Sequence, residues 1–199
     1  DLTAYLDWSG LRPMTELEYE KACRGGVAPV PNEFPWGTAG IATSAYTLAN
    51  AGAANEGIAT NYSSSAGNTS YNSTDGTNDG PLRVGIFAAN GSNAGRVTAG
   101  ASYYGIMELG GDLWERAVTV QGADGRTFTG VHGNGALASD GLPDAFAWPD
   151  PTTPNGSGFR GGSWSSGSSD LRTSDRFIAT FSEALRQNDF GGRGVRSAP

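Results

Sequence analysis

Glycine constrains the fold of this chain more than any other residue type. It occupies 31 of the 199 positions. Glycine adopts positive backbone φ without steric cost but weakens helices and strands, so this content predicts turns and long ordered loops and disfavours a helical bundle. Eight Phe, seven Tyr and five Trp residues supply apolar surface for a core, which argues against disorder. At this length we expect a single domain over residues 1–199.

Charge and cysteine content narrow the function classes. The formal net charge is -7, whereas nucleic acids and anionic membranes attract basic patches. Because of this negative charge, we expect no nucleic-acid partner. No apolar run approaches the ~18 residues of a spanning helix, so we also expect no membrane insertion. Cys23 is the one cysteine, which excludes an intrachain disulfide and a thiolate metal cluster.

The clearest helix signal covers Thr15–Arg24. Thr15 is a typical N-cap, and Glu18 three residues later completes a capping box. Gly25 and Gly26 then mark the end of the helix. A second pattern, Leu2 to Ser9, predicts the tail of an amphipathic helix.

That first helix would have four residues on its apolar side: Leu2, Tyr5, Leu6 and Trp8. Because the sequence starts inside a helix, we expect an upstream part of the domain to be missing. The region 27–93 is rich in Gly, Ala, Ser, Thr and Asn, and should hold little regular structure. Short strands are predicted over residues 83–88, 114–120, 126–130, 159–164 and 192–196. Few helices, short strands and long loops indicate an α+β fold.

Four collinear segments carry a family resemblance. They are residues 11–22 (LRPMTELEYEKA), 104–115 (YGIMELGGDLWE), 159–164 (FRGGSW) and 192–196 (GRGVR). In this order they resemble the signature blocks of formylglycine-generating-enzyme-like domains (the sulfatase-modifying factor family). The resemblance implies a C-type-lectin-like fold that is loop-rich, with short antiparallel strands and about two helices. It also implies that the N-terminal β-rich portion of the family domain is absent.

The resemblance bears on catalysis as well. Catalytic members of the family convert a cysteine of a client sulfatase into formylglycine, with copper held by a cysteine pair shortly after the Arg-Gly-Gly-Ser block. The matching positions here fall near Ser166 and Leu171, and Cu(I) prefers soft thiolate sulfur. Iron-dependent sulfoxide synthases that share the fold draw their metal histidines largely from another domain, and this chain has only His132. We therefore expect no copper and predict that the chain is not an enzyme.

Carboxylates in the same region do not suggest an acid–base pair. Asp170, Asp175 and Glu183 alternate with Arg172 and Arg176. Interleaved opposite charges are typical of salt bridges and not of a carboxyl with a raised pKa.

Structural calcium is the metal that the resemblance implies. The carried-over ligands are Glu108, Gly111, Leu113 and Glu115, and their carboxylate and carbonyl oxygens suit Ca²⁺. The alternative is that Glu115 pairs with Arg116 or Arg193. A second family site would use Asn50, Ala51, Asp79 and Pro81, with Asp75 competing for the place of Asp79.

The last forty residues also resemble the variable proteins of diversity-generating retroelements, whose C-terminal segment is mutated to make ligand-binding sites. A rigid framework tolerates many side chains in the loop between its fixed ends. The predicted binding face lies within residues 165–190. Its members are Ser165, Ser166, Ser168, Ser169, Thr173, Ser174, Phe177, Thr180, Phe181 and Asn188.

Together these patterns predict a non-catalytic ligand-binding or surface-assembly module. We expect it outside the cytoplasm or on the surface of a bacterium, with a protein or glycan ligand or copies of itself as partners. Two alternatives stay open. One is a structural subunit of a bacterial cell-surface filament or layer, and the other is a formylglycine-generating oxidase-like enzyme with altered chemistry.

Overall fold

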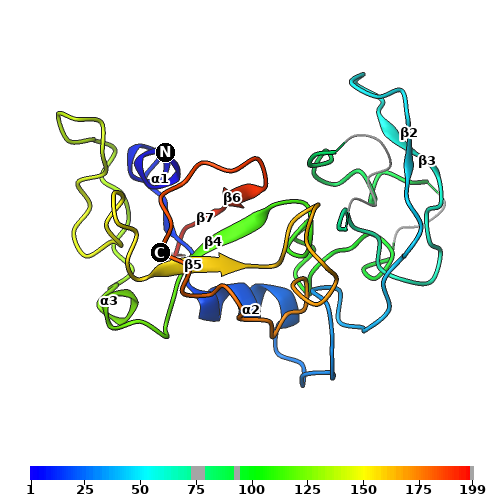
Figure 1. Cartoon of the computed structure of the whole chain (residues 1–199), viewed down its shortest axis with the longest axis horizontal. Helices are drawn as coiled ribbons and strands as arrows, with labels where there is room; N and C mark the ends of the chain where they lie inside the picture. Colours follow the sequence, from blue (N-terminus) through cyan, green and yellow to red (C-terminus); the bar gives the residue numbers. More distant parts are fainter. Residues whose placement is uncertain (73–78, 92–94, 198–199) are drawn as a thin grey trace. The chain divides into compact units, whose positions relative to one another are not determined.

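The computed structural model describes residues 1–72, 79–91 and 95–197 (Figure 1). The chain divides into two compact units. The first is made of Asp1–Tyr19, Glu115–Arg160 and Arg176–Pro199, and the second of Glu20–Trp114 and Gly161–Asp175. The prediction of one domain over the whole length stays a prediction.

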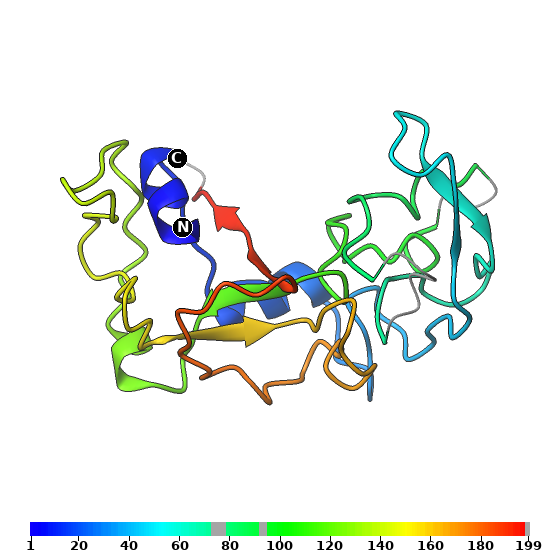
Figure 2. The ribbon, with the colours of Figure 1, turned by 45° about the horizontal axis from the view of Figure 1, so that its top comes forward.

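The first unit is built on small sheets with short helices. Its elements, with those that cross its boundary, are α1 (Leu2–Trp8), β1 (Arg12–Pro13), α2 (Glu16–Arg24), β4 (Trp114–Val118), α3 (Ala123–Arg126), β5 (Ser157–Arg160), β6 (Phe190–Gly192) and β7 (Gly194–Val195). β1 pairs with β7 antiparallel, and a three-stranded sheet has the order β5-β4-β6. Figure 2 shows β4 and β5 side by side, antiparallel with Glu115 opposite Arg160. This pairing joins two of the segments that carry the family resemblance.

The predicted capping box at the start of α2 is confirmed. Glu18 N donates to Thr15 Oγ1 at 3.2 Å, and Thr15 N donates to Glu18 Oε2 at 2.9 Å. Arg12 Nη1 also donates to Glu18 Oε2, at 2.9 Å. The helix ends at Arg24, as predicted, before Gly25 with a φ of +67°.

We predict that the cap stabilises the fold in a pH-dependent way. Burial alone would raise the pKa of Glu18, but hydrogen bonds from Arg12 and Thr15 lower it from 4.5 to about 2. A lowered folded-state pKa contributes stability above pH 4.5 that is lost as pH falls from there toward pH 2. Glu18→Gln should therefore cost about 1 kcal/mol of unfolding free energy at pH 7, a value reduced because the side chain is 37 % exposed. Urea denaturation should show that this loss shrinks at pH 3, and an equal loss at both pH values would contradict the prediction.

The second unit holds the C-terminal part of α2 and an antiparallel hairpin of β2 (Thr47–Ala49) with β3 (Gly57–Thr60), and its other described residues lie mainly in turns and loops. Two of the apolar clusters in the described part of the chain stabilise it. One contains Ala42, Tyr46, Leu82, Ile86 and Phe87, and the other contains Phe34, Trp36, Tyr71 and Leu171. For residues 27–72 and 79–91, the predicted sparse regular structure is confirmed, except for this hairpin. Its strands are short and partly exposed, and no alternation of polar and apolar residues marks them.

Three strand predictions need correction. Residues 83–88 form turns, with Ile86 N donating to Arg83 O, because the apolar run fills a core from successive turns. Residues 126–130 form no strand, since Arg126 is the last residue of the one-turn helix α3 and the residues after it lie in turn and loop. The strand predicted over 159–164 ends at Arg160, because Gly161 and Gly162 have φ values of +91° and +71°.

The polarity of α1 also differs from the prediction. Leu6 is buried as expected, but Tyr5 and Trp8 are 57 % and 63 % exposed, and Asp7 is fully buried. Over the described ranges, no helix has the length and apolar character needed to cross a membrane. The α+β class with few helices and short strands is confirmed, and the C-type-lectin-like arrangement stays a prediction.

Candidate functional site

The two positions that match the family's copper-binding cysteines have structural roles here. Leu171 is fully buried in the cluster with Phe34, Trp36 and Tyr71. Ser166 Oγ accepts from Ser163 N at 3.0 Å and lies 2.9 Å from Ser163 Oγ. An alkyl side chain and a hydroxyl do not fit Cu(I).

The segment that carries these residues is fixed by backbone hydrogen bonds within the second unit. Trp164 N donates to Asp112 O at 2.8 Å, and Gly111 N donates to Gly161 O at 2.7 Å. Asn72 N donates to Ser166 O at 2.8 Å. Residues 161–166 are therefore positioned by loops from elsewhere in the unit.

Two buried donors of this segment are unsatisfied. Trp164 Nε1 and Arg172 Nε are shielded from solvent and have no hydrogen-bond partner in the described part of the chain. The same ranges contain no ion pair of Arg172, whereas Arg176 of the first unit pairs with Glu16. The salt bridges predicted among the interleaved charges of residues 170–183 thus do not include Arg172. Donors of this kind suit a ligand that brings its own acceptor oxygens.

The ten residues of the predicted binding face are distributed over both units. Ser165, Ser166, Ser168, Ser169, Thr173 and Ser174 belong to the second, and Phe177, Thr180, Phe181 and Asn188 to the first. The prediction is wrong for Thr173, which is 1 % exposed and donates its N–H to Glu33 O. The others are exposed or partly exposed, with Phe177 at 85 %.

The predicted calcium ligands show separate local contacts. In the second unit, Glu108 has a φ of +55°, and its Oε1 accepts from Gly85 N at 3.1 Å. Gly111 of the same unit has a φ of +84°. Leu113, in the same unit, is partly buried. In the first unit, Glu115 forms an ion pair with Arg193, which confirms the alternative stated for that residue. Calcium binding itself stays a prediction.

Residues of the second predicted calcium site lie in exposed loops of the second unit. Asn50 and Asp79 have φ values of +53° and +47°, and Ala51 and Pro81 are exposed. Asp75 lies outside the described residues. Within the ranges that the structure describes, no three His, Cys, Asp or Glu side chains gather as a metal-ligand group. His132 Nε2 accepts from Ser197 N at 3.0 Å.

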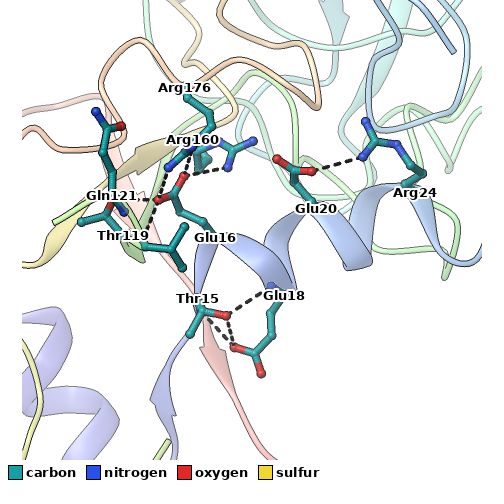
Figure 3. Close-up of polar contacts among 10 residues, drawn as sticks. Thr15, Glu16, Glu18, Glu20, Arg24, Thr119, Gln121, Arg160 and Arg176 are labelled. Carbon is teal, nitrogen blue, oxygen red and sulfur yellow. Dashed lines mark hydrogen bonds and ion pairs between the residues drawn. The ribbon is translucent and has the colours of Figure 1, made fainter. Parts of the chain in front are cut away.

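A buried charge cluster in the first unit was not predicted from the sequence (Figure 3). Glu16 is 2 % exposed, and its carboxylate accepts from Arg160 Nη1 at 3.0 Å and from Arg176 Nε at 2.8 Å. Thr119 Oγ1 and Val120 N donate to the same carboxylate at 2.7 and 2.9 Å. Burial alone would raise the pKa of Glu16, but the hydrogen bonds from Arg176, Thr119 and Val120 and the charge of Arg160 lower it. With every oxygen engaged by protein donors, this cluster is a structural element.

The first unit also contains a pocket of about 720 Å³. Its lining is mainly apolar, with Leu2 and Leu6 from α1, Leu142 from a loop, and Phe190 from β6. Arg116 of β4 lines it as well. No local sequence pattern predicts this pocket, because its walls come from segments far apart in the chain.

The comparison with curated proteins corrects one prediction about function. The chain is 33 % identical over 113 residues to hercynine oxygenase from Mycolicibacterium smegmatis. The match covers 56 % of this chain and only 18 % of that relative. Because this relative is an enzyme, the prediction that the chain is not an enzyme is wrong.

The comparison with protein families covers nearly the whole chain. Residues 1–198 match the family described as sulfatase-modifying factor enzyme 1-like domain. The segments that pair as β4 and β5 both fall within that match. The chain therefore belongs to the sulfatase-modifying factor enzyme 1-like domain family.

Proposed function

We propose that this chain is a domain of an oxygen-using enzyme related to hercynine oxygenase, and that residues 161–175 contact the substrate. The observation that carries the proposal is the 33 % identity to that oxygenase within a family match over residues 1–198. The matched part is 18 % of the relative's length. The proposal therefore assigns this chain one part of the reaction, the binding of a small substrate.

The side chains of the segment support this role. Trp164 Nε1 and Arg172 Nε are buried donors without partners in the described structure. Leaving such a donor unsatisfied costs about 1–3 kcal/mol. A substrate oxygen that accepts from either nitrogen would recover that energy and fix its own orientation. The hydroxyls of Ser163 and Ser165, 3.2 Å apart, add polar groups in the same segment.

The two positions that correspond to the family's copper-binding cysteines do not fit Cu(I). The copper positions hold Ser166 and Leu171, and His132 accepts from the Ser197 backbone. The proposal therefore takes no reaction step through a metal and gives residues 161–175 the task of holding the substrate.

The test is oxygen consumption by the full-length protein with Fe²⁺, hercynine and a thiol peptide. We expect hercynine-dependent oxygen uptake, and Arg172→Gln should lower kcat/KM about tenfold or more, because a hydrogen bond to a charged donor is worth about 1.5–3 kcal/mol. Arg83→Gln is the matched control, since Arg83 is an exposed arginine of the same unit. Its Nε lies 3.9 Å from Glu56 Oε1, so it forms a surface ion pair. Oxygen uptake that is independent of hercynine, or equal losses in both variants, would contradict the proposal.

Other predictions stay open beside this one. Calcium binding remains a proposal at Glu108, Gly111, Leu113 and Glu115 and at the second predicted set of ligands. Thermal unfolding with excess chelator would test it, and an unchanged Tm would contradict it. The bacterial cell-surface location, the protein, glycan or self partners, and the likeness to retroelement variable proteins remain predictions. A filament or layer subunit also remains a prediction.

A further inference from the structure

The 720 Å³ pocket of the first unit has an unusual distribution of charge. Four charged residues line the pocket, and three of them have a salt-bridge or hydrogen-bond partner for the charged group. Asp1 and Arg186 pair with each other at 2.6 Å, with side chains that are 71 % and 84 % exposed. Asp150 Oδ1 accepts from the N–H groups of Thr152 and Thr153 in its own turn. The fourth charged residue is Arg116.

Arg116 lies on β4, directly opposite Phe159 of β5, and the centre of its guanidinium is 4.3 Å from the centre of that ring. Its Nη1 donates to Ser157 Oγ at 3.0 Å and its Nη2 to Glu183 O at 2.6 Å. Both acceptors are neutral, and no carboxylate pairs with Arg116 across the described ranges. Burial lowers the pKa of Arg116. The guanidinium is thus partly desolvated and oriented by a ring and two hydrogen bonds, without a carboxylate partner in the described ranges.

This arrangement suits a carboxylate. A guanidinium has five N–H donors, of which the described structure engages two, and it binds a carboxylate through parallel hydrogen bonds. Phosphate carries more charge and usually recruits more than one cation, whereas the other arginine of this pocket already pairs with Asp1. Apolar residues of the lining include Leu6, Leu142, Pro149 and Phe190. The volume falls within the ~300–1,000 Å³ range of small-molecule sites.

We propose that this pocket binds a small monocarboxylate with an apolar body, whose carboxylate contacts Arg116 while its body fills the space between α1, β4 and β6. The site lies wholly in the first unit, and the inference goes beyond the proposed function. It concerns equilibrium binding and holds whether or not residues 161–175 bind an oxygenase substrate.

The test compares a carboxylate with its neutral amide. Dissociation constants of 3-phenylpropanoate and 3-phenylpropanamide are measured by NMR titration of the full chain, with octanoate as an aliphatic acid and inorganic phosphate as a competing anion. We expect 3-phenylpropanoate to bind about tenfold or more tightly than the amide, because a charged hydrogen bond contributes on the order of tenfold to a hundredfold in affinity. Octanoate should compete with 3-phenylpropanoate for the pocket. If octanoate binds more tightly, the natural ligand is a lipid-derived acid. If octanoate binds more weakly, the natural ligand is an aromatic acid. Phosphate should not compete.

Variants locate the site. Arg116→Gln should abolish the preference for acid over amide, and Arg186→Gln, which changes an exposed arginine on the same pocket, should keep it. Leu142→Trp, which narrows the pocket without changing Arg116, should weaken both ligands and serves as the second test if Arg116→Gln does not fold. Equal affinity of acid and amide for the unmodified protein would overturn the proposal. So would a loss of the preference in Arg186→Gln with retention in Arg116→Gln, or unchanged binding in Leu142→Trp. Turnover is not part of the readout, so failure here leaves the proposed oxygenase function untouched.

Discussion

Glu16→Gln is expected to lower the free energy of unfolding by about 3–5 kcal/mol, the largest effect predicted for a single side chain of this protein. The substitution removes the negative charge that accepts from Arg160, whose side chain has no exposed surface. Arg160 would keep its contact with the Tyr19 ring, 4.9 Å from the guanidinium centre, but its buried charge would lack the Glu16 carboxylate. A single cation–π contact contributes less than this loss, about 0.5–2 kcal/mol.

Glu20→Gln is the matched control, since it makes the same chemical change on the same helix (Figure 3). Glu20 pairs with Arg24 at 3.2 Å, and the two side chains are 32 % and 17 % exposed. A pair of this kind is worth about 0.3–1 kcal/mol. Urea denaturation of both variants gives the comparison, and equal losses would contradict the assignment of Glu16 as the buried counter-charge.

The same cluster predicts acid sensitivity. Because hydrogen bonds and Arg160 lower the pKa of Glu16 in the folded state, its stabilisation is present at neutral pH and is lost as pH falls below 4.5. The Glu16→Gln protein should therefore lose less stability than the unmodified protein as pH falls from 4.5 to 3.

Asp7→Ala is expected to lower the free energy of unfolding by about 2–4 kcal/mol and to release the loop over residues 131–148. The Asp7 carboxylate is fully buried. Its Oδ1 accepts from Asn134 N at 2.9 Å, and its Oδ2 accepts from Asp144 N at 2.8 Å and Ala145 N at 3.1 Å. Hydrogen bonds to a charged acceptor are the stronger ones, so three of them hold the loop to α1.

Hydrogen exchange at those three amides is the specific readout for Asp7. Exchange should accelerate there more than at the amides of β4 and β5, because the loop loses its anchor while the sheet keeps its pairing. Asp150→Ala is the control, since Asp150 also accepts from two backbone N–H groups and a hydroxyl but is fully exposed. Its effect should be smaller, and faster exchange in Asp150→Ala than in Asp7→Ala would refute the role given to Asp7.

The features predicted well from sequence are those whose partners are close in the chain. The capping box needs only Thr15 and Glu18, three residues apart, and the helix end needs only Gly25. The strand Trp114–Val118 was found from its own apolar residues, with its end two residues too late. The four collinear segments were sufficient to place the chain in its family, which the match over residues 1–198 confirms.

Predictions about function failed where an absence was taken as evidence. Missing cysteines near Ser166 and Leu171 led to the prediction of a non-enzyme, which the relationship to hercynine oxygenase overturns. Thr173 was placed on a binding face from its neighbours in sequence, although its side chain is buried. Local composition does not report which side of a loop faces a core.

The sequence alone determined the α+β class, the start and end of α2 and the family, because these depend on short-range hydrogen bonds, glycine positions and collinear motifs. Only the tertiary structure showed that Glu16 meets Arg160 and Arg176, that Asp7 holds a loop more than 120 residues away, and that Arg116 lines an apolar pocket. In each case the partners are far apart in the chain, and the free energy of a buried charge depends on neighbours that only folding brings into contact.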